Sequence, residues 1–343
     1  MVHDATSSLV LSGCGWVTPC AVGSIDEVLA AWAKDSAVSQ VADGGFCRVP
    51  DDPPIADISH LSNELKRDKG AWMAALAIEH ACRTASLPLQ MLDSDRVGLA
   101  LGCGLAGQLG MIEFASEVRK QSVRFVSPIH FPQTVGNYVA GAIARSYKLR
   151  GPNATFASGA SSSLDAIIEA CAWVARGDAD VVLAGGVERL TNGLAMGFGS
   201  DGAALSEGAC FVVVESADHA SRRSASPLAN VVRCAPGPDR HAETGILSTA
   251  GCALPGAVVI EHATGLCLGA AGAAATAAAI GAAHGAVVPR VDASDSRTVT
   301  FGVMDLAGLD VADGYIRATI LAANKPSARD QFVRLELNIP VSS

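Results

Sequence analysis

The sequence predicts an α/β fold, in which apolar strands alternate with helices along the chain. Residues 96–104 (RVGLALGCG) form a continuous apolar run, which is typical of a strand buried on both faces of a parallel sheet. Residues 70–87 place Trp72, Leu76, Ile78 and Ala81 at helical spacing. Residues 151–186 then repeat the alternation as strand, sharp turn, helix and strand, ending at an apolar Gly-Gly pair.

The other elements are expected in the same alternation. The first half predicts a strand at 8–19, helices at 110–120 and 134–149, and a strand that runs into a helix at 208–223. The second half predicts two strands around a Pro- and Gly-rich connection, an Ala-rich helix within 264–285, two further strands at 296–308 and 314–323, and a tail. Because the composition shifts to Ser, Pro and Gly within residues 221–256, we expect a boundary there and two halves, 1–225 and 226–343.

Composition and charge exclude several classes of function. The 343-residue chain has a net charge of −9 and no long basic block, so nucleic acid is a poor partner. No apolar run approaches the roughly 18 residues that a membrane span needs. The N-terminus has no basic segment followed by an apolar one, as a secretory signal would. We therefore expect a cytoplasmic protein that has no membrane partner.

The ten cysteines are scattered and form no C-x-x-C pair. Most of them stand in apolar segments, such as Cys14, Cys103 and Cys171. Free cysteines that pack as small apolar side chains explain this pattern better than disulfides or a metal site. We expect neither a metal nor a cofactor.

The turn at residues 156–164 (FASGASSSL), called the elbow below, holds only small side chains where a nucleophile would be expected. Gly159 and Ala160 allow a sharp turn, and Ser161, Ser162 and Ser163 are expected to cap the following helix. A nucleophile at the start of such a helix gains from the positive end of the helix dipole. Neither Gly159 nor Ala160 has a side chain that can attack a substrate, so the setting of a nucleophile is present without the nucleophile.

These residues resemble the elbow of elongating β-ketoacyl-ACP synthases, whose pattern is Gly-Pro, strand, Ala-Cys-small-Ser, helix, Gly-Asp-Ala-Asp and an apolar Gly-Gly strand end. Four further segments resemble that family in the correct order, namely 13–32, 127–144, 205–223 and 264–278. The resemblance covers roughly residues 9–285. It implies a thiolase-like fold with two pseudo-symmetric halves in a five-layered α/β/α/β/α arrangement, in which the helix after Ala160 and the Ala-rich helix are buried between the sheets.

The departures from the family pattern concern the catalytic residues. The family's cysteine falls on Ala160, its Gly-His-x-Leu-Gly histidine on Leu266 and the preceding lysine on Glu261, and the chain has no His-Gly-Thr triplet. Decarboxylative condensation needs a nucleophile and donors that stabilise the carbanion and the oxyanion. Since the nucleophile and both histidines are missing together, the resemblance implies no catalysis by this chain alone.

Within this family the pattern resembles the chain-length factor, the non-condensing partner of a ketosynthase in type II polyketide synthases. That resemblance implies a heterodimer with a catalytic ketosynthase, a tunnel for the growing chain at their interface, and contact with an acyl carrier protein through the complex. The usual glutamine at the cysteine position is Ala160 here, so the decarboxylating role attributed to that glutamine does not carry over to this chain. The short second half suggests polyene-type products.

The tunnel and interface candidates belong to the segments before and within the elbow unit. Met111, Phe114 and Val118 share a helix face and are first of all expected to be core residues, with tunnel lining as the alternative. The candidates taken together are Met111, Phe114, Val118, Phe131, Val135, Asn137 and Phe156.

Two other functions stay open at this point. One is an acyl-processing enzyme, such as a decarboxylase, thioesterase or acyltransferase, that uses Ser161 or Cys267 as a new nucleophile. The other is a homodimeric acyl-carrier or lipid-binding protein that needs no ketosynthase.

Overall fold

The computed structural model describes most of the first half of the chain and separate elements of the second half. The statements below concern the residues that it describes, which are 8–34, 46–51, 57–104, 106–122, 124–126, 128–190, 205–236, 257–259, 268–284, 302–305, 315–323 and 332–340.

The first half of the chain forms a mixed sheet. Its strands lie side by side in the order β1 (Leu9–Val17), β8 (Gly208–Ser216), β6 (Val181–Glu188), β4 (Val97–Gly102) and β5 (Asn153–Phe156). β4 runs parallel to both β5 and β6, whereas β8 is antiparallel to β6 and β1. β4 is buried along its whole length, as its continuous apolar run predicts, and β5 is the edge strand.

The strands of the second half continue the sheet through a short antiparallel contact between β1 and β9. Their order is β9 (Ala229–Pro236), β13 (Phe332–Pro340), β12 (Tyr315–Ala323), β11 (Gly302–Asp305) and β10 (Ala257–Val259). Each pair of neighbours among these described strands is antiparallel. The second half therefore has as many described strands in this order as the first half, but it lacks the parallel pairs of the first half. The sequence predicted a tail where β13 lies, and that prediction is wrong.

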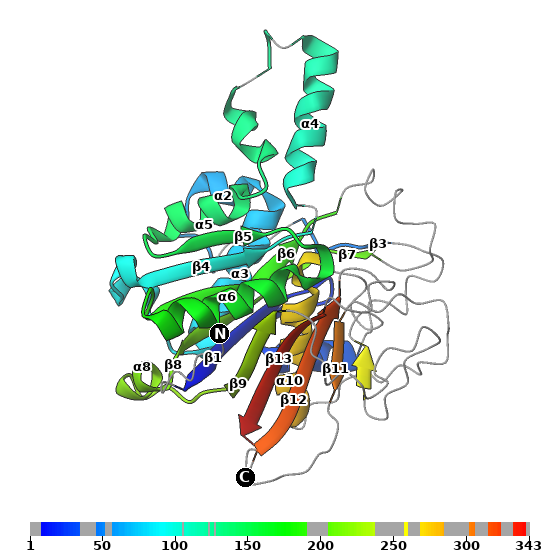
Figure 1. Ribbon diagram of the computed structural model, residues 1–343. Helices are drawn as coiled ribbons and strands as arrows, with labels where there is room; N and C mark the ends of the chain where they lie inside the picture. The colour runs from blue at the N-terminus through cyan, green and yellow to red at the C-terminus, as the bar shows by residue number, and fades with distance from the viewer. Residues whose placement is uncertain are drawn as a thin grey trace.

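Helices cover the first half-sheet and separate it from the second (Figure 1). The outer face is covered by α3 (Lys69–Thr84), next to which lie α2 (Asn63–Arg67) and α5 (Tyr138–Tyr147). Two central helices, α6 (Ser162–Arg176) and α10 (Ala271–Ala283), pack between the two sets of strands and share one apolar core with them. This arrangement is an α/β thiolase-like fold. The described residues form four of the five expected layers.

Small residues bring the central helices close together, as predicted. A Cβ atom added at Gly272 of α10 would lie 2.7 Å from the Cβ of Leu164 in α6. One added at Gly281 would lie 2.2 Å from Leu29 of α1 (Ile25–Lys34). The alanines of α10 from Ala273 onward are almost all fully buried, so this helix is a core element whose surroundings are apolar on every side.

The remaining elements are short. They are β2 (Val22–Gly23), which pairs with β1, the parallel pair β3 (Phe46–Cys47) and β7 (Leu205–Ser206), the helix α8 (Ala217–Arg222), and the 3-10 turns η2 (Leu89–Met91), η3 (Ser94–Arg96), η4 (Pro128–Thr134), η5 (Gly159–Ser161) and η7 (Leu268–Ala270).

α4 (Ala106–Gln121) and η4 project together from the body as an arm, which we call the tower (Figure 1). α4 and η4 are in close contact at Gly110, where an added Cβ would lie 1.9 Å from the carbonyl oxygen of Gln133. The rings of Phe114 and Phe131 meet edge to face, with centroids 5.8 Å apart. The sequence predicted that Met111 is buried in the core, but 58% of it is exposed, so that prediction is wrong.

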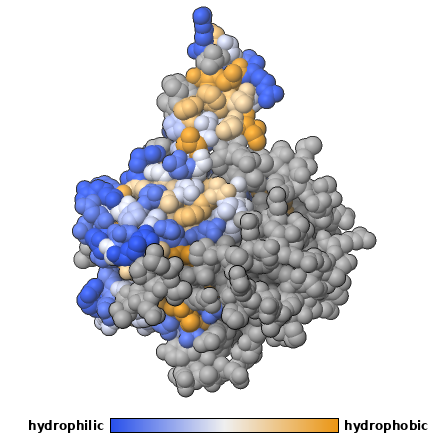
Figure 2. All heavy atoms as spheres, viewed as in Figure 1, coloured by the Kyte–Doolittle hydropathy of each residue, from blue (hydrophilic) through white to orange (hydrophobic). Residues whose placement is uncertain are grey.

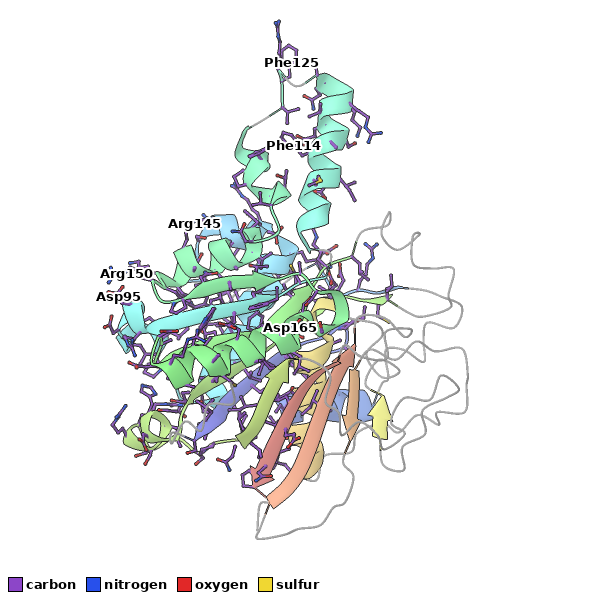
Figure 3. All side chains as sticks on the ribbon, viewed as in Figure 1. Asp95, Phe114, Phe125, Arg145, Arg150 and Asp165 are labelled. Atoms are coloured by element: carbon purple, nitrogen blue, oxygen red, sulfur yellow. The ribbon has the colours of Figure 1, made fainter. Side chains whose placement is uncertain are left out.

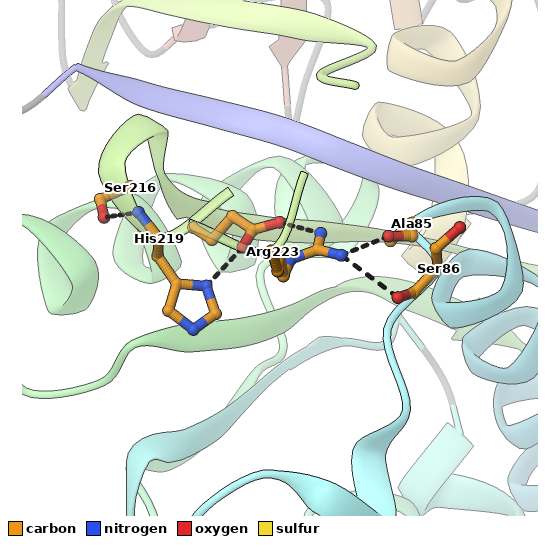
Figure 4. Close-up of polar contacts among 6 residues, drawn as sticks. Ala85, Ser86, Ser216, His219 and Arg223 are labelled. Atoms are coloured by element: carbon orange, nitrogen blue, oxygen red, sulfur yellow. Dashed lines mark hydrogen bonds and ion pairs between the residues drawn. The ribbon is translucent and has the colours of Figure 1, made fainter. Parts of the chain in front are cut away.

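A buried ion-pair network fixes α8 against β8 (Figure 4). Glu215 is fully buried. Its Oε2 accepts a hydrogen bond from Nε of Arg223 (3.0 Å), and its Oε1 accepts one from Nη2 of the same guanidinium group. Nδ1 of His219 lies 2.5 Å from the same carboxylate, and Nη1 of Arg223 donates to the carbonyl oxygens of Ala85 and Ser86. Burial raises the pKa of Glu215, but the hydrogen bonds from Arg223 and His219 outweigh burial, and the net pKa lies below the ordinary value.

Candidate functional site

The elbow follows β5 directly and turns the chain into α6. Gly159 has a φ of 71°, which lies in the left-handed region that favours glycine. Residues 159–161 form η5, and α6 begins at Ser162. Gly177 ends α6 in the left-handed conformation, as the sequence predicted. The backbone therefore has the sharp strand-to-helix turn that places position 160 at the start of a helix.

The hydroxyl groups of the elbow bind one another and one carboxylate. Ser162 Oγ donates to the carbonyl oxygen of Gly159 (2.6 Å) and accepts from the N–H of Ser158 (3.0 Å). Ser161 Oγ donates to Oδ2 of Asp165 (2.9 Å), and Ser158 Oγ donates to the same oxygen. The sequence predicted that Ser161 caps α6. It is the N-cap residue, but its side chain accepts no backbone N–H of the helix, because its hydroxyl group is directed to Asp165.

The start of α10 lies against the start of α6. Ser163 Oγ accepts from the N–H of Ala273 (3.1 Å). The buried carboxylate of Glu188 accepts from the N–H groups of Gly104 and Gly269, both at 2.9 Å. A Cβ at Gly186 would lie 2.0 Å from the carbonyl oxygen of Gly269, so only glycine fits at that strand end. Two helix N-termini thus converge beside the elbow.

Of the positions at which the family has catalytic residues, the structure describes only some. Ala160 lies within η5, which directly precedes α6 and contacts α10. Leu266 lies outside the described residues, as do Glu261 and Cys267. Cys103, whose N–H donates to the carbonyl oxygen of Phe156, is a thiol beside the elbow that the sequence did not single out for this site. It is only 2% exposed, and its Sγ donates to the carbonyl oxygen of Gly136 (3.8 Å), so it is placed for packing rather than for attack.

The structure brings most of the tunnel and interface candidates together in the tower. Met111 and Phe131 are each 58% exposed and Val135 is 44% exposed. Asn137 is exposed at the foot of the tower, whereas Phe114, Val118 and Phe156 are half-buried. Phe156 lies apart from the others, at the end of β5.

Sequence reasoning missed two exposed apolar residues of the tower, Ile112 (51% exposed) and Phe125 (74% exposed). Figure 2 shows that apolar side chains gather along the flank of the tower, whereas its far end is hydrophilic. Phe125 lies at that far end (Figure 3), and the sequence that precedes it holds the basic residues Arg119, Lys120 and Arg124. The pair Met111–Ile112 was a signal, since two adjacent helical residues cannot both face one narrow core seam.

The described residues contain neither a membrane-spanning helix nor a cluster of potential metal ligands. In this part of the chain no helix is long and apolar enough to cross a membrane. Within the same residues, no group of three or more His, Cys, Asp and Glu side chains is arranged to hold a metal ion.

The mixed sheet, the elbow and the two central helices together define a ketosynthase-like protein of the thiolase-type fold. Residues 52–219 match the family model described as "Beta-ketoacyl synthase, N-terminal domain". This part of the chain therefore belongs to the β-ketoacyl synthase family.

Curated relatives resemble the chain over part of their length. The chain is 26% identical over 256 residues to 3-oxoacyl-(acyl-carrier-protein) synthase 2 of Coxiella burnetii, a match that covers 65% of this chain and 61% of the relative. It is 32% identical over 176 residues to the protein of the same name from Vibrio cholerae, covering 44% of this chain and 42% of that one. The matches thus span about three fifths or less of the length of these relatives.

Solved structures resemble almost the whole chain in fold. The ishigamide ketosynthase/chain length factor superposes with a TM-score of 0.73 at 15% identity, covering 98% of this chain and all of the other. A type II PKS acyl-carrier protein in complex with its ketosynthase bound to the hexaketide superposes with a TM-score of 0.69 at 16% identity, covering 97% and 99%. At these identities the likeness supports the fold.

Proposed function

We propose that this chain is a chain-length-factor type subunit that pairs with a catalytic ketosynthase and shapes the tunnel for an acyl-carrier-protein-bound polyketide chain. The observation on which the proposal rests is the elbow itself. Its left-handed Gly159 and its helix start are those of a nucleophile-bearing turn, but position 160 has a methyl group. A methyl group cannot form the thioester through which a ketosynthase holds its growing chain.

The hydroxyl groups of the elbow do not replace that nucleophile. Ser161 is 1% exposed and donates its hydroxyl proton to Asp165, as Ser158 also does. A serine nucleophile needs a base and an accessible substrate carbonyl, and burial removes the second condition for Ser161. These contacts disfavour an acyl-processing enzyme built on Ser161, and they support a structural role for the serines.

The tower and the edge strand supply the surface that a partner would cover. The flank of the tower exposes Met111, Ile112 and Phe131, and β5 has a neighbouring strand on only one side among the described residues. An exposed apolar arm beside an unpaired strand edge is unfavourable in water and is typical of a surface buried in an assembly. The obligate pair proposed here would bury more than roughly 2,000 Å² in total.

The ketosynthase would build the products of the pair, and this chain would limit their length. The two proposed halves, 1–225 and 226–343, would then have separate roles, with the first supplying the tower and the elbow. Polyene-type products remain part of the proposal, on the basis of the short second half.

A reconstituted synthase tests this function. The ketosynthase encoded nearest to this chain, its carrier protein and malonyl donor are incubated with and without the chain, and the acyl products are measured by mass spectrometry. We expect products of defined length only when the chain is present. Equal product distributions in both samples would contradict the proposal, and acyl labelling of the chain alone would favour an enzyme instead.

A further inference from the structure

Three consecutive residues at the end of β6, Glu188, Arg189 and Leu190, tie together elements that meet at the foot of the tower. Glu188, fully buried, accepts the N–H groups of Gly104 and Gly269. Arg189 donates from Nη1 to Oδ2 of Asp68 (3.4 Å), and its Nη2 lies 3.8 Å from Oε1 of Glu113. The N–H of Leu190 donates to Glu207.

The partners of Glu188 and Arg189 belong to separate elements. Gly104 lies directly before the tower, and Glu113 is on α4 within the tower. Asp68 is the N-cap of α3, where its Oδ1 accepts from the N–H of Ala71 (2.8 Å). Because one carboxylate oxygen of Asp68 is fixed by α3 and the other accepts from Arg189, the guanidinium group is anchored on the body side and reaches toward the tower from there.

The tower needs such an anchor. Its flank is exposed rather than packed on the body, and it is tied at its foot by contacts such as the hydrogen bond that the N–H of Gly104 donates to the carboxylate of Glu188. A projecting arm that pivots at its foot would have to be ordered when a partner binds, which costs affinity. The ion pair with Asp68, in which Arg189 is 28% exposed and Asp68 14% exposed, holds the guanidinium group on the body. The contact of the same group with Glu113 on α4 then restricts that pivot beforehand.

We propose that Arg189 is a positioning residue that fixes the angle of the tower and so presents its apolar flank to the partner in one orientation. The identity of the partner rests on the function proposed above. Glu113 is 55% exposed, so its pair with Arg189 is modest in strength. Loss of either residue should therefore change the affinity by about two- to five-fold rather than abolish pairing.

Subunit exchange in the co-purified complex tests the proposal. The complex of this chain with the ketosynthase is mixed with excess isotope-labelled chain, and exchange is followed by native mass spectrometry. We compare Arg189→Met, Glu113→Gln and the double variant. Arg189→Lys keeps the charge, and Arg176→Met removes an exposed arginine whose partners Glu169 and Asp178 lie on and just after α6, away from the tower.

Each single variant should accelerate exchange about two- to five-fold, the double variant should add little, and Arg189→Lys should keep most of the wild-type behaviour. Arg176→Met should exchange at the wild-type rate. Because weaker pairing itself lowers the stability of a complex slightly, the thermal midpoint should fall by no more than about 2 °C. Wild-type exchange in all variants would overturn the proposal while leaving the heterodimer intact, and so would faster exchange accompanied by a larger fall of the midpoint. If no complex with the ketosynthase forms at all, the proposed function fails first.

Discussion

At position 160 the chain keeps the backbone of a nucleophile-bearing turn and lacks the side chain. The left-handed Gly159, the hydroxyl contacts of Ser158 and Ser162, and the close approach of α10 are all structural features that do not need a reactive group. They therefore persist as fold determinants in a site without its nucleophile. Asp165, which accepts from two serine hydroxyl groups, is a member of this frame.

Restoring the thiol alone should not restore condensation. In Ala160→Cys the thiol would stand at a helix start, which favours the thiolate, but the chain has Leu266 where the family's histidine would be and no His-Gly-Thr triplet. We expect at most slow acylation by an acyl donor and no condensation product, measured by mass spectrometry of the protein and of the released acyl chains. A condensation product formed by this single variant would contradict the account.

Glu215 gives a prediction about stability and its pH dependence. In Glu215→Gln the charge of Arg223 loses its buried counter-charge, so the free energy of unfolding should fall by about 3–5 kcal/mol. The pKa of Glu215 is lower in the folded protein, so its contribution is complete above about pH 4.3, the value in an unfolded chain, and is lost as the pH falls through the folded-state pKa. The acid-side decline in stability should therefore be weaker in Glu215→Gln.

Urea unfolding at several pH values measures both effects. The matched control is Asp95→Asn, which removes an exposed pair with Arg150 and should change the stability by no more than about 0.5 kcal/mol. Equal losses in the two variants would mean that the Glu215 network does not fix α8 in the way described.

At the scale of elements, sequence patterns predicted those helices and strands whose formation depends on neighbouring residues. The continuous apolar run of β4 and the helical spacing of α3 were sufficient for those elements, and the Ala- and Gly-rich composition was sufficient for a buried α10. Residues 332–340 alternate Val333, Leu335, Leu337 and Ile339 with polar residues, which is a strand signal that the prediction of a tail overlooked.

The tower shows why the rest could not be predicted. Met111 and Phe114 have the spacing of an ordinary core helix, and spacing alone does not tell whether an apolar face is covered by its own chain or by another. The Ser161–Asp165 contact likewise depends on the helical conformation of Ser161, which its capping preference did not indicate. The position without a nucleophile was predictable, because it rests on a motif in the sequence.

Two glycine substitutions should have opposite effects on stability, one where α6 and α10 pack closely and the other on α5. Gly272→Ala places a Cβ 2.7 Å from that of Leu164, so it should destabilise the protein by about 1–3 kcal/mol. Gly141→Ala lies on α5, where the nearest atom is 3.7 Å away on the flexible Arg145 side chain, so it should stabilise by up to about 1 kcal/mol. Thermal unfolding of both variants checks the signs, and a Gly272→Ala variant as stable as Gly141→Ala would contradict this packing.

At the scale of the whole molecule, the first half supplies a rigid sheet, a site without a nucleophile and an exposed arm. If the flank of the tower lines the tunnel of the proposed complex, enlarging Met111 or Val118 to Trp should shorten the product without abolishing turnover. Val232→Trp, on the exposed face of β9, is the matched control and should leave the product length unchanged. Mass spectrometry of the products distinguishes these outcomes, and an unchanged length in all three variants would exclude the tower from the tunnel.

The mass of the assembly in solution tests the central claim most directly. The chain is expressed alone and together with the ketosynthase encoded nearest to it, and each preparation is analysed by size-exclusion chromatography with light scattering. The account predicts that the chain alone aggregates through its exposed tower and β5 edge, and that the co-expressed chains elute as a 1:1 complex. A well-behaved monomer, or a homodimer that ignores the ketosynthase, would contradict it.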